Sequence, residues 1–129
     1  AGIAEEQVLV GTGHFHFESG VAVVDDWLSK PGAPTAIIAD NDQMAFAVLH
    51  VAGRRSISIP ASLSVISFED TPGVRFSVPP LTAIRQPTAR MVATACDRLI
   101  AVSRGEEGEG TYQIDFDLVV RETTGPAAR

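Results

Sequence analysis

Polar and aromatic side chains follow four short apolar runs of the sequence that have the character of strands. The four sets are His14, Phe15 and His16 after the first run, Asp40, Asn41 and Asp42 after the second, Glu69 and Asp70 after the third, and Gln86 after the fourth. Carboxylate and amide groups at fixed positions suit a ligand with many hydroxyl groups, and an aromatic ring can cover the apolar face of a sugar. The pattern therefore predicts a site for a small polar ligand, a carbohydrate or a nucleoside.

Each of these residues also has a simpler structural interpretation. Asn41 and Asp42 are equally consistent with capping a helix, and Glu69 with Asp70 is equally consistent with starting a turn. Gln86 fits an ordinary loop, and a phenylalanine such as Phe15 is more often found in a core. The agreement among all four strand ends favours the ligand site over any one of these alternatives.

Other chemistry is less well supported. His14, His16 and Glu18 have metal-like spacing, but no distant fourth ligand accompanies them, so no metal or other cofactor is expected. Asp42 and Glu69 could in principle hydrolyse a glycoside, but nothing in the sequence positions one as acid and the other as nucleophile. We therefore expect a binding module rather than an enzyme.

The elements that must position these residues alternate between strand and helix. Strands are predicted at residues 8–10, 35–39, 64–68 and 82–85 and in the alternating stretch 112–121. Helices are predicted from Ser19, after the capping residues 40–42, and from Thr88. The run at 35–39 is apolar throughout, which is typical of a strand buried on both faces. Strand–helix alternation predicts an α/β fold, a three-layer sandwich with a mostly parallel sheet and helices on both faces.

Composition limits the class of partner. The chain has 129 residues, 45% hydrophobic, with a net charge of −6, and a chain this long buries roughly two-thirds of its unfolded surface without disulfides. The acidic balance argues against direct binding of DNA. No apolar run could cross a membrane and no signal pattern opens the chain, so a cytoplasmic protein is expected. The single cysteine, Cys96, lies on the apolar side of a predicted helix and is expected in the core.

Five segments resemble, in constant order, the motifs of one known family. They are GHFHFESG at 13–20, PTAIIADNDQMA at 34–45, IPASLSVISFED at 59–70, PPLTAIRQP at 79–87 and LVVRETT at 118–124. They are similar to G-[DN]-[FW]-x-x-x-S-G, P-T-A-[apolar]-x-x-N-D-x-M-A, V-P-x-D-[IL]-S-V-[VI]-G-F-D-D, P-P-L-T-T-[VI]-x-Q-P and L-V-x-R-x-S-T of the lactose-repressor (LacI/GalR) transcription regulators. The matches span nearly the whole chain.

The resemblance implies one lobe of a periplasmic-binding-protein-like fold, in which two α/β lobes are hinged around an effector cleft. Residues 1–129 then correspond to the C-terminal subdomain, without the N-terminal subdomain and the DNA-binding headpiece. By position Phe15, Asn41, Glu69 and Gln86 match effector contacts, and Asp42 and Asp70 complete the ligand-binding set. The implied partners are a sugar or nucleoside effector, a second copy in a homodimer, and operator DNA through the headpiece only; no membrane is expected.

The sequence departs from the family motif at two positions, and one loop is expected at a dimer contact. Glu69 stands where the family has Asp, and Ser67 where it has Gly, so effector size or identity is expected to differ. The resemblance also places a dimer contact in the loop that holds Val74, Arg75, Phe76 and Val78, although packing of Phe76 and Val78 on the chain's own core is an equal alternative. A transport protein of the same fold and a small glycoside hydrolase remain rival functions.

Overall fold

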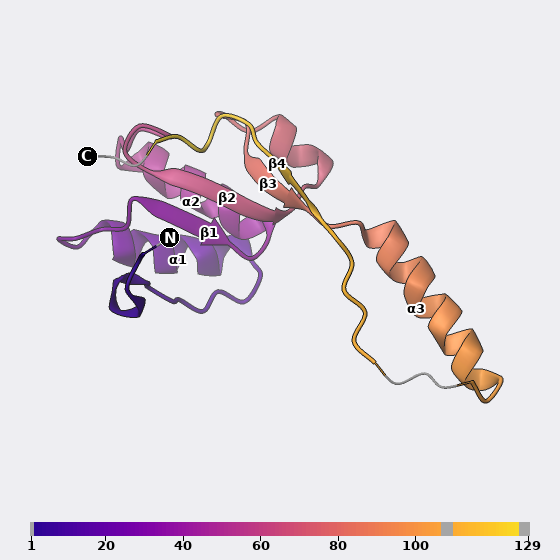
Figure 1. Ribbon diagram of the computed structural model, residues 1–129. Coiled ribbons are helices and arrows are strands. Elements are labelled where there is room, and N and C mark those ends of the chain that lie inside the picture. The colour runs from indigo at the N-terminus through magenta and orange to yellow at the C-terminus, as the bar shows by residue number, and fades with distance from the viewer. Residues whose placement is uncertain (1, 107–109, 127–129) are drawn as a thin grey trace.

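The computed structural model describes residues 2–106 and 110–126 of the chain, and Figure 1 shows a compact body from which one helix projects. The elements, in order, are η1 (Glu5–Gln7), α1 (Phe17–Leu28), β1 (Ala36–Ala39), α2 (Asp42–Arg54), β2 (Ser64–Glu69), η2 (Pro72–Arg75), β3 (Thr82–Arg85), α3 (Thr88–Ser103) and β4 (Asp117–Val119).

The four strands form one sheet in the order β1-β2-β3-β4. β1 pairs with β2 and β2 pairs with β3 in parallel, whereas β4 pairs with β3 antiparallel, with Ile84 opposite Leu118. The predicted α/β fold with a mostly parallel sheet is confirmed. Of the stretch 112–121, only Asp117–Val119 forms the predicted edge strand.

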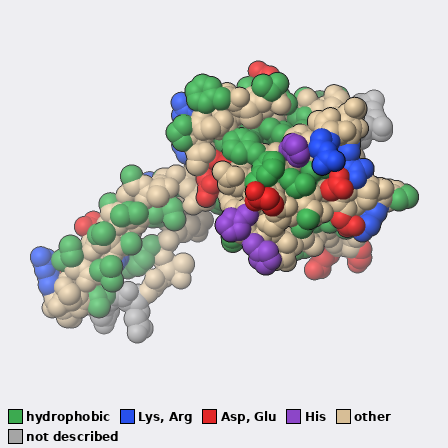
Figure 2. Space-filling view, turned by 180° about the vertical axis from the view of Figure 1, so that it is seen from behind, with side chains coloured by type: hydrophobic (Ala, Val, Ile, Leu, Met, Phe, Trp, Pro, Cys, Tyr) green, Lys and Arg blue, Asp and Glu red, His purple; other side chains and the backbone are tan. Residues whose placement is uncertain are grey.

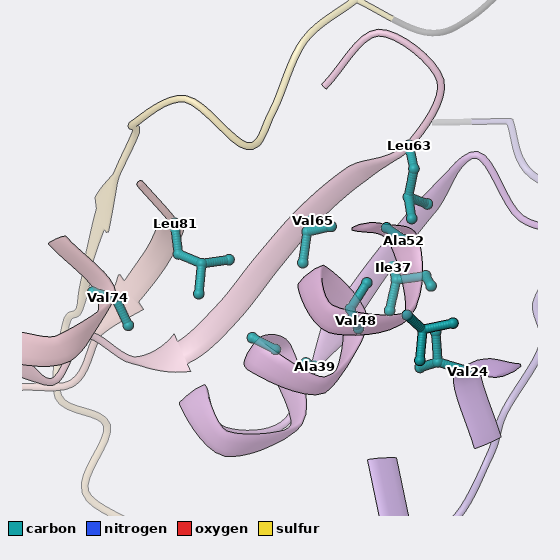
Figure 3. Close-up of a cluster of buried hydrophobic side chains, with 11 residues drawn as sticks. Val24, Ile37, Ala39, Val48, Ala52, Leu63, Val65, Val74 and Leu81 are labelled. Carbon is teal, nitrogen blue, oxygen red and sulfur yellow. The ribbon is translucent and has the colours of Figure 1, made fainter. Parts of the chain in front are cut away.

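The core lies between the sheet and two helices. α2 lies against β1 and β2, and α1 packs beside α2. Figure 3 shows side chains from the sheet, α1 and α2 meeting in one cluster. Its fully buried members include Leu63, Val65 and Leu81 from the sheet side and Val48 from α2. The alternation of buried and exposed residues along β1 and β2 directs one side of each strand into this cluster.

The opposite face of the sheet differs from the prediction. Ile38, in the middle of β1, is 68% exposed, and Leu118 on β4 is also exposed. The expectation that 35–39 is buried on both faces is therefore wrong for the described residues. The reason is that α1 and α2 cover the same face, while α3 covers neither.

α3 and the chain that returns from it form the arm, which comprises residues 88–106 and 110–116. The other described residues, 2–87 and 117–126, form the body. Figure 1 shows the arm projecting away from the body, and Figure 2 shows hydrophobic side chains along its surface. Within α3, which is described in full, no residue is buried. Cys96 is exposed, so its expected place in the core is wrong.

The predicted strand at 8–10 is not part of the sheet. These residues are exposed and have no regular secondary structure, and no ladder pairs them with β1 in the described structure. The chain instead crosses α1 closely at Gly11, where a Cβ atom would lie 2.5 Å from the Val23 side chain. Three residues without a hydrogen-bonded neighbour cannot form a strand, whatever their propensity.

Candidate functional site

The carboxyl ends of β1, β2 and β3 meet at one edge of the sheet, because the three strands are parallel. We call this the strand-end edge; it comprises residues 14–16, 40–42, 69–70 and 86. Figure 1 shows that β2 points toward the side from which the arm leaves. In open α/β sheets ligands bind outside the carboxyl ends of the strands, so this is the edge at which the predicted site belongs.

Asn41 joins two parts of this edge. Its Oδ1 accepts a hydrogen bond from the Met44 backbone N–H at 2.8 Å, which caps α2, and its Nδ2 donates to the Phe15 carbonyl at 3.0 Å. The capping role predicted as an alternative is therefore real. The same side chain also fixes the loop that carries Phe15, which places that loop beside the end of β1.

Phe15 presents its ring to solvent at this edge. It is 62% exposed and has a φ of 56°, a left-handed conformation that non-glycine residues adopt rarely and at a cost. The alternative that Phe15 is a core residue is wrong. An exposed aromatic ring on a loop anchored by Asn41 can stack on a flat apolar ligand surface.

Asp42 is buried and holds the loop that follows β2. Its Oδ2 accepts from the Thr71 backbone N–H at 2.7 Å, while Oδ1 has no partner among the described residues. Ser67 Oγ, on the buried side of β2, is the second buried polar atom without one. Asp42 thus connects the start of α2 to the end of β2, and a carboxylate held in this way is poorly placed to act on a glycosidic bond.

Glu69 and Asp70 both adopt positive φ, 136° and 63°, and their side chains have opposite environments. Glu69 is exposed at the edge. The Asp70 side chain is 0% exposed and lies between two guanidinium groups: Arg85 contacts Oδ2 at 2.7 Å and Arg121 contacts Oδ1 at 2.5 Å. A ligand cannot reach this carboxylate, so the assignment of Asp70 as a ligand-binding residue is wrong.

The two arginines also set the protonation of Asp70. Burial of the carboxylate opposes its ionisation, but hydrogen bonds from Arg121 and Arg85 and the charges of both outweigh burial. The pKa of Asp70 therefore lies below its ordinary value of 3.8.

Gln86 completes the edge. It follows β3 directly and is half-buried, and its carbonyl accepts from the Thr88 backbone N–H at 2.9 Å at the start of α3. The structure thus brings Phe15, Asn41, Glu69 and Gln86 to one edge. It assigns Asp42 and Asp70 to the framework behind that edge.

The loop expected at a dimer contact is divided between core and surface. Val74 is fully buried in the chain's own core, so its expected role at a dimer surface is wrong. Phe76 and Val78 are 82% and 91% exposed, and Arg75 is exposed beside them. The alternative that Phe76 and Val78 pack on the chain's own core is therefore wrong.

A groove lies on the arm, away from the strand-end edge. It has a volume of about 600 Å³ and lies between α3 and the returning chain, with Leu99 and Ile114 among its lining residues. Arg98 lies over the Tyr112 ring at 4.1 Å within it. Sequence reasoning missed this groove, although the apolar spacing along α3 was a signal for it. The described residues contain no group of three or more His, Cys, Asp or Glu side chains that could hold a metal ion.

Comparison with known proteins decides the family. Residues 1–124 match the family described as "Periplasmic binding protein-like domain". The chain belongs to this family. The match covers every element of the fold and all residues of the strand-end edge.

The relatives are transcription regulators of the lactose-repressor type. The chain is 32% identical over 124 residues to the HTH-type transcriptional repressor CytR of Escherichia coli (strain K12), covering 95% of this chain and 36% of the relative. It is 34% identical over 127 residues to the HTH-type transcriptional regulator DegA of Bacillus subtilis (strain 168), covering 98% and 37%. The chain therefore spans little more than a third of these relatives.

Solved structures agree. A LacI family transcriptional regulator from Bifidobacterium animalis superposes with a TM-score of 0.84 at 33% identity, covering 90% of this chain and 43% of that one. The lac repressor dimer bound to operator and the anti-inducer ONPF superposes with a TM-score of 0.81 at 31% identity, covering 87% and 39%. The resemblance to the LacI/GalR regulators is confirmed, and these relatives are regulators rather than enzymes.

One further property concerns membranes. Among the described residues, no helix combines the length and apolar composition that a membrane crossing requires.

Proposed function

We propose that this chain is the effector-binding part of a LacI-type transcription regulator, and that a sugar or nucleoside binds at its strand-end edge. The supporting observation is the exposed Phe15 ring, held by Asn41 at the edge where Glu69 and Gln86 also lie. The ring covers an apolar ligand face, while Glu69 and Gln86 supply hydrogen-bond acceptors and an amide donor. Asn41 positions the loop and offers its remaining amide hydrogen to the ligand.

The exposed apolar surface of the arm is an argument for a second lobe that faces this edge. The apolar side chains of the arm, among them Leu99 and Ile100, are exposed, and the solved relatives are more than twice as long as the part that this chain covers. Residues 1–129 would then hold the C-terminal subdomain, with the N-terminal subdomain, which packs on the arm, and the DNA-binding headpiece outside this sequence. A ligand between two lobes loses contact with water and gains hydrogen bonds from both walls.

Regulation then follows from the difference in ligand affinity between two lobe arrangements. An effector that binds one arrangement more tightly shifts the population toward it, and the spacing of the DNA-binding heads changes with it. The exposed Arg75, Phe76 and Val78 would contribute to the homodimer that brings two heads to an operator. Such a regulator works in the cytoplasm, where its DNA is.

The experiment is a thermal-shift screen of the full-length regulator that carries this chain, against common monosaccharides and ribonucleosides. At least one compound should raise the melting temperature of the wild type. Gln86→Ala should reduce that shift. Gln43→Ala changes an exposed side chain in the first turn of α2; it is the matched control and should keep the shift. No shift with any compound, or equal shifts in both variants, would contradict the proposal.

A further inference from the structure

Asp70 lies where the two connections between body and arm meet. Arg85 is the last residue of β3, three positions before α3 begins, and its Nε donates to Asp70 Oδ2 at 2.7 Å. Arg121 follows β4, where the chain has returned from the arm, and its guanidinium donates to Asp70 Oδ1. One buried carboxylate therefore holds the chain both as it leaves for the arm and after it returns.

Arg121 is itself fixed to the body. Its guanidinium donates to the Leu81 carbonyl at 2.6 Å, and its backbone N–H donates to Thr82 Oγ1 at 2.9 Å. Thr123 continues this attachment by donating from Oγ1 to the Val65 carbonyl at 2.7 Å. Asp70 thus connects Arg121, which is hydrogen-bonded to the body, to Arg85. The Arg85 side chain is partly exposed at the base of the arm.

The arm has little else to fix its direction. No residue of α3 is buried, and α3 is described in full. Besides the covalent chain, the described contacts at its base include the short antiparallel ladder of β3 with β4, which ends at Arg85 and Asp117, and the ion pairs of Asp70. A segment with so few buried contacts changes orientation at low free-energy cost unless its base is held.

The residues proposed to contact the effector adjoin this cluster along the chain. Glu69 precedes Asp70, and Gln86 follows Arg85. The positive φ of Glu69 and Asp70 turns the chain so that one side chain is exposed and the next is buried. A ligand held by Glu69 and Gln86 therefore acts on peptide groups attached directly to both members of the Asp70–Arg85 pair.

We infer that Asp70 is a positioning residue that fixes the direction of the arm by holding its two connections together, and so links the strand-end edge to the arm. Its link to effector binding rests on the function proposed above; its control of the arm does not. Because the neighbouring lobe would pack on the arm, a change at Asp70 would alter how the two walls of the cleft face each other.

The test is a pair of spin-label distances on this chain without any effector. The arm distance joins the native Cys96 on α3 to a label at Ser62→Cys on the body. The body distance joins Glu18→Cys to Ser62→Cys in a Cys96→Ser background. All these positions are exposed. Asp70→Asn keeps the size of the side chain and removes its charge. Asp25→Asn removes the exposed ion pair with Arg55 and is the matched control.

Asp70→Asn should roughly double the width of the arm-distance distribution, because the base of an arm with few buried contacts is released, and should leave the body distance unchanged. Asp25→Asn should leave both unchanged. An arm distribution of wild-type width, or equal broadening of both distances, would overturn the inference, since the second result marks only a loosened fold. If circular dichroism shows that Asp70→Asn does not fold, Arg85→Gln replaces it; it should broaden the arm distance less, and no broadening would overturn the inference.

Because no effector is used, failure of this test would leave the proposed ligand site standing. Failure of the ligand screen would equally leave the distance result intact.

Discussion

α2 and α3 have similar amphipathic sequences and opposite surroundings. α2 buries six residues, including Val48 and Val51, against the sheet and α1, whereas α3 buries none. Both helices repeat apolar residues three and four apart, as a helix with one covered face does. The comparison shows that amphipathic spacing predicts that a helix buries one face, but it does not predict which part of the protein covers that face. For α3 the described residues of this chain do not supply it.

The two regions should therefore differ in how they are stabilised. The body has a contiguous core, so its stability depends on side-chain burial. α3 has 16 residues, close to the length at which an isolated helix is marginal in water. Four sets of variants test this difference between the body and the arm.

The largest effect comes from matched leucines. Leu63 is 1% exposed in the body and Leu99 is 70% exposed on the arm. Leu63→Ala should lower the free energy of unfolding by about 3 kcal/mol, because it leaves a cavity in the core. Leu99→Ala should change it by less than about 0.5 kcal/mol. Urea denaturation measures both, and a cost at Leu99 comparable to that at Leu63 would show that the arm packs on the body.

The next effect concerns the junction between the regions. Arg121→Gln should cost about 2 kcal/mol, because it removes charge-assisted hydrogen bonds and leaves a buried carboxylate with one partner. Arg55→Gln, which breaks an exposed pair with Asp25, should cost less than about 1 kcal/mol. The measurement is again urea denaturation. Equal costs would mean that Asp70 contributes no more than a surface ion pair.

A smaller effect is expected at the N-cap of α2. Asn41→Ala should cost about 1 kcal/mol, because the Met44 N–H loses its acceptor. It should also free the Phe15 loop, which hydrogen–deuterium exchange of residues 14–16 would detect. Gln43→Ala, an exposed position in the same turn, is the control. Unchanged exchange in Asn41→Ala would separate the cap from the loop and weaken the connection proposed for the edge.

The smallest effect is on pH dependence. Because the pKa of Asp70 is lowered in the folded protein, its ionisation stabilises the fold fully above the ordinary Asp pKa. That stabilisation is lost as pH falls through the folded-state pKa. Thermal melts from roughly pH 6 down to pH 2, a range that extends well below the ordinary Asp value, should show a steeper loss for the wild type than for Asp70→Asn. Parallel curves would contradict the charge account of the cluster.

Local pattern was enough to predict much of the body and the edge. The apolar runs that became β1, β2 and β3 and the caps around Asn41 are encoded by neighbouring residues, and parallel strands bring their ends together by geometry alone. The resemblance supplied the family. The predictions failed where the outcome depends on residues far apart in the sequence.

Asp70 is the clearest case of such a failure. Its burial requires Arg85, 15 residues away, and Arg121, 51 residues away. The residues next to Asp70 in the sequence do not indicate either ion-pair partner. The burial expected for Ile38 and for the apolar face of α3 failed for a related reason. The sequence of a strand or helix does not indicate whether the element that would cover its apolar face is present. The run at 8–10 has strand character and no neighbour to pair with.

Calorimetry on two phenylalanine variants shows whether the strand-end edge binds the effector. The titrant is the screened compound that gives the largest thermal shift on the full-length regulator. Phe15→Ala should weaken its affinity by about tenfold, since a stacked ring contributes on the order of 1.4 kcal/mol. Phe76→Ala, which is also exposed but lies on the loop proposed for the dimer, should bind as the wild type does. Wild-type affinity in Phe15→Ala would contradict the account.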